Sequence, residues 1–253
     1  MKTSPAWQKH LLRGVLLLLL CTAALQMVFI ARIALMVVLA PQSTTFQRSE
    51  AWRLMVDKHQ IVWSQDWVDL PRIAANLQRA VIASEDANFT EHSGVEWDSI
   101  EKAWQKNQRA EQRVEKIKQR QPATTTKAVM AKVVGGSTIS QQLAKNLFLS
   151  GERTALRKAQ ELVLTVALET LLSKQRLLEI YLNNVEWGEG LFGAQAAARH
   201  YFRVDAARLG PEQAARLAVM LPAPKRFEKN PASAYVLGRS ATIAARMGAV
   251  AIP

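Results

Sequence analysis

The sequence is poor in cysteine, with Cys21 alone among 253 residues, and it holds four histidines. One cysteine excludes an intramolecular disulfide, and a metal-thiolate cluster needs several Cys or His at close spacing. Acidic residues are also scarce, since 21 Asp and Glu stand against 33 Lys and Arg, a net charge of +12. This excess indicates an anionic partner, which could be nucleic acid, a phosphate-bearing substrate or an anionic membrane.

Charge is absent from one long apolar run, from Gly14 to Ala31. Those 18 residues would span about 27 Å as a helix, close to the thickness of a bilayer's hydrocarbon core. The alternatives are a cleaved signal peptide, whose apolar stretch is shorter, and a buried core helix, which is rarely so uniformly apolar. Arg32 interrupts the run, and its long stem is expected to reach the headgroups.

The topology follows from the basic residues that precede this run. They predict a cytoplasmic N-terminus over residues 1–13 and a transmembrane anchor over 14–40. A juxtamembrane segment, 41–65, and a domain, 66–253, would then lie outside the cytoplasm. That location argues against nucleic acid as the partner.

Strand patterns are almost absent, so the domain is predicted to be mainly α-helical. Asp69-Leu70-Pro71 is expected to open a helix, and Ala-rich residues 194–221 are expected to form another. A further helix is predicted over 157–172. Its core candidates are Leu162, Val163, Val166, Leu168 and Leu171.

Three polar clusters carry candidate chemistry. In the first, Glu85 and Asp86 end a helix and are followed by Phe89, His92 and Gly94. The helix dipole disfavours acids at that end, so other contacts must hold them there. A solvated turn is the structural interpretation, and a partly buried Glu85 with a raised pKa, suited to acid or base catalysis, is the functional one.

The second cluster follows Gly135-Gly136. Thr138 and Gln141 have the spacing of a capping box, so a helix should begin there and continue through Phe148. Its N-terminal end and its amide and ammonium side chains could bind sugar hydroxyls and phosphate oxygens, although an ordinary exposed face is the alternative. The polar residues concerned are Ser137, Thr138, Gln141, Gln142, Lys145 and Asn146.

The third cluster consists of three basic residues that precede one acidic residue. Arg153, Arg157 and Lys158 precede Glu161, and Arg157 and Glu161 are four residues apart. A surface ion pair is the structural interpretation. The functional one is a second carboxylate flanked by cations that face a pyrophosphate.

Together these motifs resemble the signatures of family 51 glycosyltransferases, the peptidoglycan polymerases. The motifs are Glu-Asp-x-x-Phe-x-x-His-x-Gly, Gly-Gly-Ser-Thr-Ile-Ser-Gln-Gln-x-x-Lys-Asn, Arg-Lys-x-x-Glu and the Lys174 to Asn183 stretch. The resemblance covers about Asp66 to Arg226 and implies a lysozyme-like helical fold. Since no transpeptidase domain follows, it points to a monofunctional member that polymerises lipid II into β-1,4 glycan with inversion.

The resemblance also implies residue roles. Glu85 would be the base that deprotonates the acceptor hydroxyl, and Glu161 the second acid, near the leaving pyrophosphate. Lys145 and Arg153 would stabilise that pyrophosphate, with a divalent cation (Mg or Mn) as a candidate cofactor and no organic cofactor. The remaining residues implied to line or brace the cleft are Asp86, Ser137, Thr138, Gln141, Gln142, Asn146, Arg157 and Lys158.

The implied partners are lipid II, the growing glycan chain, membrane lipids and other cell-division or cell-wall synthesis proteins. The implied location is the bacterial inner membrane, with a periplasmic catalytic domain. One departure from the family is a long basic insert at about residues 105–132. It is interpreted either as a contact with lipid headgroups or as a solvated insert with no role. Competing functions are a lytic hydrolase of similar fold and a non-catalytic membrane scaffold.

Overall fold

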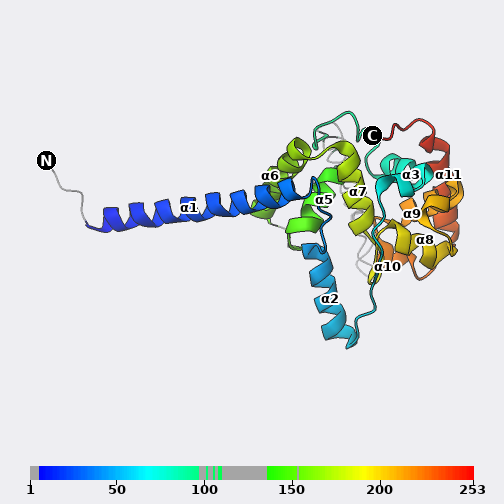
Figure 1. Cartoon of the computed structure of the whole chain (residues 1–253), viewed down its shortest axis with the longest axis horizontal. Coiled ribbons are helices and arrows are strands. Elements are labelled where there is room, and N and C mark those ends of the chain that lie inside the picture. Colours follow the sequence, from blue (N-terminus) through cyan, green and yellow to red (C-terminus); the bar gives the residue numbers. More distant parts are fainter. Residues whose placement is uncertain (1–5, 97–100, 102–104, 106–107, 110–135, 153) are drawn as a thin grey trace, which may run out of the picture.

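A long apolar helix dominates the outline of the computed structural model, which describes residues 6–96, 101, 105, 108–109, 136–152 and 154–253. Helix α1 (Ala6–Leu35) extends from the domain as a rod, with most of its apolar side chains exposed (Figure 1). Its stretch Trp7–Leu35 is long and apolar enough to cross a membrane. The predicted apolar run therefore lies within one continuous helix.

The domain is built from short helices and one small sheet. Its elements are α2 (Thr45–Lys58), β1 (Ser64–Gln65), η1 (Leu70–Arg72), α3 (Ala75–Glu85), α5 (Ile139–Phe148), α6 (Ala155–Leu171), α7 (Lys174–Asn184), β2 (Glu186–Gly188), β3 (Leu191–Phe192), α8 (Ala194–Phe202), η2 (Ala206–Arg208), α9 (Pro211–Met220), α10 (Pro224–Phe227) and α11 (Ala234–Met247). The prediction of a mainly helical fold is confirmed.

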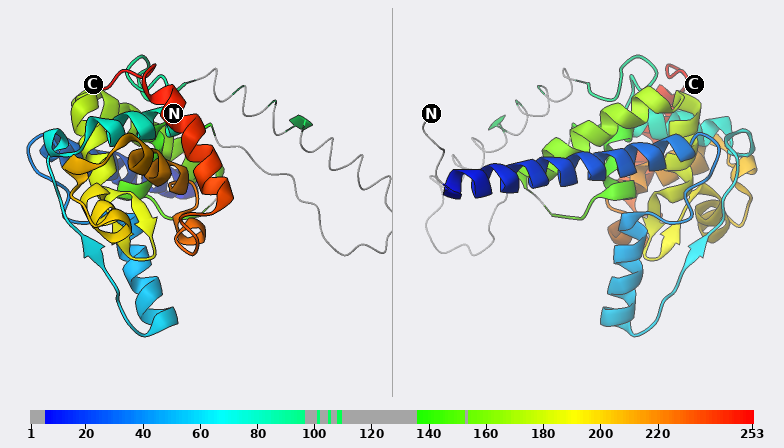
Figure 2. Two further views of the ribbon diagram at one scale, coloured as in Figure 1. Left: turned by 90° about the vertical axis from the view of Figure 1, so that its right-hand side faces the viewer. Right: turned by 60° about the vertical axis from the view of Figure 1, so that its left-hand side comes forward.

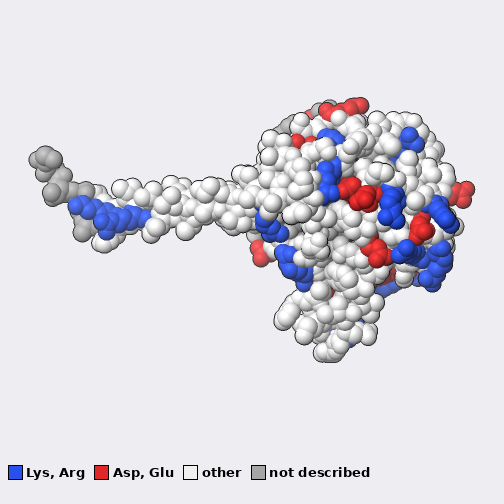
Figure 3. Space-filling view, viewed as in Figure 1, with Lys and Arg blue, Asp and Glu red and all other residues white. Residues whose placement is uncertain are grey.

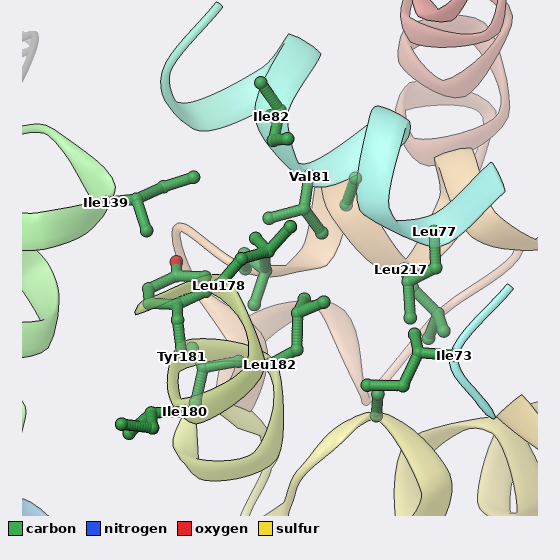
Figure 4. Close-up of a cluster of buried hydrophobic side chains, with 14 of the residues drawn as sticks. Ile73, Leu77, Val81, Ile82, Ile139, Leu178, Ile180, Tyr181, Leu182 and Leu217 are labelled. Carbon is green, nitrogen blue, oxygen red and sulfur yellow. The ribbon is translucent and has the colours of Figure 1, made fainter. Parts of the chain in front are cut away.

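Helices α3, α9 and α11 pack together on one side, and α5 packs against α6, α7 and α2 on the other (Figure 1). The two groups share an apolar core, in which Val81 of α3, Ile139 of α5 and Leu178 of α7 are fully buried (Figure 4). Burying such a side chain contributes about 1.5–3 kcal/mol. The core thus fixes the end of α3, where Glu85 lies, against the start of α5.

The end of α1 belongs to the domain instead of being a free tether. Ile33 and Met36 are buried in the core, and Phe29 packs edge-on against Phe148 with ring centroids 5.4 Å apart. Gln26 and Gln160 of α6 exchange two amide hydrogen bonds of 2.8 and 3.0 Å. Helix α1 therefore runs beside α6 (Figure 2).

The segment predicted as juxtamembrane holds a helix and a strand. Thr44 and Gln47 form a capping box that starts α2, and α2 projects from the body (Figure 1). Strand β1 pairs in parallel with β3, in the order β1-β3-β2. Gly190 turns the chain before β3 with φ +68°, and a Cβ there would lie 2.0 Å from the Val62 carbonyl oxygen.

Two predicted helices are broken in the structure. Residues 70–72 form a separate 3₁₀ turn, because the Gln78 amide donates to the carbonyls of Leu70 and Ile73 before α3 begins. The stretch 194–221 divides into α8, η2 and α9, since Arg203 ends α8 with φ +59° and Pro211 starts α9.

The predicted core face of α6 is largely wrong. Leu168 is fully buried, but Val163 and Val166 are each 51% exposed, and Leu162 and Leu171 are also exposed. The buried side of α6 is rotated toward Leu164 and Leu168. An apolar face of this helix is therefore open to its surroundings.

Candidate active site

A cleft of about 440 Å³ lies between α2, α5 and α6. It brings together eight of the residues singled out from the sequence. These are Ser137, Gln141, Gln142, Lys145, Asn146, Arg157, Lys158 and Glu161. The second and third polar clusters of the sequence thus share one cavity.

Glu85 is the last residue of α3, and its carboxylate reaches Gln142 on the cleft wall. The Gln142 amide nitrogen donates to Glu85 Oε2 over 2.8 Å, and the hydroxyl of Tyr181 donates to the Gln142 carbonyl oxygen over 3.0 Å. Because Tyr181 is buried, it fixes which way the amide points. The contact that holds an acid at this helix end is therefore a neutral amide.

Burial raises the pKa of the Glu85 carboxyl above its usual range, and the neighbouring Asp86 adds to this effect. Hydrogen bonds from Gln142 and Ser84 and the charge of Lys145 oppose the rise in pKa without cancelling it. A carboxylate with a raised pKa is a stronger base than a free one. Glu85 is therefore suited to accept a proton.

Asp86 is buried and directs both carboxylate oxygens into the protein. Its Oδ1 lies 2.8 Å from His92 Nε2, and its Oδ2 accepts the backbone N–H of Ile139 over 2.9 Å. Since the Gly94 N–H donates to His92 Nδ1, the proton of the neutral imidazole is on Nε2 and points to Asp86. Asp86 therefore fastens the acidic motif to the N-terminal end of α5.

Thr138 is likewise structural in its contacts. Its hydroxyl accepts the N–H of Gln141 and donates to the Gly94 carbonyl over 2.6 Å, and the predicted capping box with Gln141 is confirmed. Gly94 has φ +88°, and a Cβ there would lie 2.7 Å from Glu169 Cγ. This junction joins two polar clusters that are far apart in sequence.

Glu161 belongs to the cleft lining and is buried. Its carboxylate is paired with Arg157 over 2.8 Å and with Lys158. Arg157 Nε is buried and has no hydrogen-bond partner among the described residues. This donor is therefore left unpaired inside the protein, beside the ion pair that Arg157 Nη1 makes with Glu161.

Lys145 interacts electrostatically with both carboxylates. It is solvent-accessible, but the protein atoms around it lower the pKa of its ammonium group, an effect that Glu161 opposes most and Glu85 less. Arg157 and Lys158 add to the lowering of the pKa by repulsion. Lys145, Arg157 and Lys158 thus gather positive charge in the cleft lining, while Glu85 lies outside that lining and is bonded to it through Gln142.

Sequence reasoning missed the contribution of α2 and of Tyr181. Phe46, Ser49 and Glu50 form part of the cleft wall although they belong to the predicted juxtamembrane segment. The Thr44–Gln47 capping pair was a signal that could have found this helix. The role of Tyr181 had no signal in the sequence, because it depends on how α7 packs against α5. Arg153, Gly135 and the basic insert, apart from residues 105, 108 and 109, lie outside the described residues.

A protein-held metal does not fit the described residues. No group of three or more His, Cys, Asp or Glu side chains that could hold a metal is found among them, and the Glu161 carboxylate is already paired with two cations. The divalent cation stays a prediction.

Comparison with known proteins assigns this chain to a family. The family described as Transglycosylase matches residues 54–248. Proteins named biosynthetic peptidoglycan transglycosylase from Burkholderia thailandensis and Paraburkholderia xenovorans are 49% and 47% identical over 230 residues, which is 91% of this chain and 82% and 88% of theirs. The predicted family and its lysozyme-like helical fold are confirmed. The chain belongs to the transglycosylase family.

Proposed function

We propose that this chain is a peptidoglycan glycosyltransferase that polymerises lipid II into β-1,4 glycan strands. The proposal is carried by one observation, the polarity of the cleft. A carboxylate with a raised pKa, Glu85, faces a neutral amide, and Lys145, Arg157 and Lys158 gather around Glu161.

In the proposed reaction, the 4-hydroxyl oxygen of the acceptor sugar attacks C1 of the donor sugar. Glu85 Oε1 or Oε2 takes the hydroxyl proton as the C–O bond forms, while the bond from C1 to the pyrophosphate oxygen breaks. Attack from the face opposite the leaving group inverts the donor linkage from α to β. The products are a lengthened glycan and undecaprenyl pyrophosphate.

The cationic end of the cleft would bind the leaving pyrophosphate. The side chains of Lys145, Arg157 and Lys158 line the cleft and can donate charge-assisted hydrogen bonds to phosphate oxygens. Glu161 holds Arg157 and Lys158 in place, so it acts here by positioning cations. Charge that develops on the leaving group is stabilised most by donors fixed beforehand.

A hydrolase of similar fold would use water where this enzyme uses a sugar hydroxyl. The cluster of three cations favours a donor with a pyrophosphate, which a hydrolase of finished glycan does not need. Purified full-length chain should convert lipid-linked disaccharide-peptide into glycan polymer. Release of sugars from finished cell wall without polymer formation would establish the hydrolase instead.

Helix α6, which carries Arg157 and Lys158, also supports a location at the membrane surface. Leu156, Gln160 and Val163 lie on one face of α6; Leu156 is 82% exposed, and Gln160 contacts α1. The exposed apolar face of α6 is therefore continuous with the apolar surface of α1. This arrangement would place the cleft at headgroup level, where the pyrophosphate of a lipid-linked substrate lies.

We further propose a single-pass inner-membrane topology with the domain in the periplasm. Figure 3 shows Lys and Arg side chains at the outer end of α1, followed by an uncharged stretch of the rod, in accord with a cytoplasmic N-terminus. Protease added to intact spheroplasts should digest the domain. Complete protection of the domain would contradict this orientation. Contacts with other cell-wall synthesis or division proteins, and with lipids through the insert, stay predictions.

A further inference from the structure

A second cavity, of about 260 Å³, lies where the chain leaves α1 and enters α2. Two arginines, Arg32 and Arg48, form its polar walls, and Leu35 and Leu39 form its apolar side. Gln42 and Ser43, just before the N-cap of α2, also lie on the polar side. The proposed catalytic chemistry uses none of these residues.

Arg48 is held in place without being neutralised. Its Nη1 donates to the Ser43 hydroxyl over 3.0 Å, and its Nη2 donates to the Thr45 hydroxyl over 3.0 Å. These acceptors are uncharged, and a guanidinium has five N–H donors in all. The contacts therefore fix the guanidinium beside the cavity and leave it with positive charge and unused donors.

Arg32 is also positioned by an uncharged group. Its guanidinium carbon lies 5.2 Å from the centroid of the Phe148 ring. Within the described part of the chain, neither Arg32 nor Arg48 lies within 4.0 Å of a carboxylate. Two fixed guanidinium groups on one cavity, with no carboxylate between them, form a site for an anion.

The surroundings indicate which anion. Leu35 and Leu39 are more than half exposed, and so is Val38 between them. These apolar residues follow directly on the apolar run of α1, at the end that joins the domain. Figure 3 shows basic side chains beside the uncharged surface of the rod at this junction. A ligand here would meet positive charge and apolar surface together.

We propose that this cavity binds the phosphate of an anionic membrane phospholipid, whose acyl chains lie along Leu35 and Leu39. The site is separate from the catalytic cleft, because Arg48 lies on a different face of α2 from Phe46 and Glu50, which line that cleft. The inference rests on the proposed membrane anchoring by α1. It does not rest on the catalytic chemistry, and its test measures lipid binding instead of turnover.

The test uses full-length chain in detergent micelles, titrated with phosphatidylglycerol and analysed by native mass spectrometry. The double variant Arg32→Gln/Arg48→Gln should bind this lipid about thirtyfold more weakly, equivalent to about 2 kcal/mol, since each arginine near an anionic lipid surface contributes about 1 kcal/mol. The control, Arg239→Gln/Arg246→Gln, removes the same charge from exposed positions on α11 and should bind like the unaltered chain.

Two further titrations test which ligand the cavity prefers. Phosphatidylcholine and inorganic phosphate should each leave the unaltered chain largely unbound, because the first has no net charge and the second has no acyl chains. Arg48→Lys, which keeps the charge but loses the fork of donors, should have an intermediate affinity and covers the case in which the double variant fails to fold. Equal phosphatidylglycerol binding by Arg48→Lys, the double variant and the control, or equal binding of inorganic phosphate and lipid, would overturn the proposal.

Discussion

Two candidate catalytic carboxylates, Glu85 behind the cleft wall and Glu161 in its lining, are held in opposite ways. Glu85 accepts a hydrogen bond from the neutral amide of Gln142, whereas Glu161 is paired with the cations Arg157 and Lys158. Burial and the neighbouring Asp86 favour the protonated form of Glu85 and raise its pKa. A neutral partner leaves a carboxylate free to accept a proton, and a cationic pair commits it to holding charge in place.

The environments of Glu85 and Glu161 also arise in different ways. Glu85 depends on α3, α5 and α7 meeting correctly, since its amide partner is oriented by Tyr181. The pairs of Glu161 lie within a single helix, at i+3 and i+4 spacing. The base is therefore a product of the tertiary fold, and the cation cluster is largely a product of local sequence.

The largest expected effect comes from removing the base. Glu85→Gln keeps the shape and the contact with an amide, but it cannot accept a proton, so the polymerisation rate should fall about 100- to 10,000-fold. The measurement is glycan polymer formed from lipid II. Glu212→Gln, an exposed residue on α9, is the matched control and should retain full activity. Activity of Glu85→Gln near that of the control would remove Glu85 from the chemistry.

Removing Lys145, whose ammonium group interacts electrostatically with Glu85 and Glu161, should have the next largest effect. Lys145→Ala should lower the rate about 100-fold through lost stabilisation of the leaving pyrophosphate. The exposed Lys229→Ala removes the same charge away from the cleft and serves as control. If the two variants behave alike, the charge at Lys145 has no special role.

A change at Gln142 tests the neutral partner of Glu85 directly. The hydrogen bond from this amide lowers the pKa of Glu85, so Gln142→Leu should raise that pKa further. Because a base acts in its deprotonated form, the acidic limb of the pH–rate profile should move to higher pH. Below the limb, the rate should fall about tenfold for each pKa unit of that movement. An unmoved limb would show that the amide does not tune the base.

The smallest effect is expected from a change at Tyr181, which contacts Gln142 and not Glu85 itself. Tyr181→Phe removes the hydroxyl that orients the Gln142 amide, and the loss of about 1 kcal/mol should lower the rate about fivefold. The acidic limb of the pH–rate profile should shift in the same direction as in Gln142→Leu, but by less. A purely structural role for Tyr181 would reduce thermal stability without moving the limb.

Local sequence was enough to predict the helices that carry the cations. Thr138 and Gln141 identified the start of α5, and the spacing of Arg157 and Glu161 predicted their ion pair. The anchor was predictable because an uncharged run of its length has few other uses.

Contacts between distant segments could not be predicted. The partner of Asp86 is a backbone N–H 53 residues away, and Tyr181 reaches Gln142 across 39 residues. The apolar residues of α6 were misplaced for a related reason. Periodicity finds an apolar face but does not say whether the core or a lipid surface covers it, and Val163 was assigned to the core.

The contacts between α1 and the domain couple the orientation of α1 to the orientation of the cleft. Because Gln26 is bonded to Gln160 and Phe29 packs on Phe148, a change in the tilt of α1 turns α5 and α6, which carry the cleft, through the same angle. Membrane helices tilt to match the thickness of the bilayer around them. With the proposed membrane anchoring, the height of the cleft above the lipid surface would depend on acyl-chain length, and membrane thickness would then influence the enzyme.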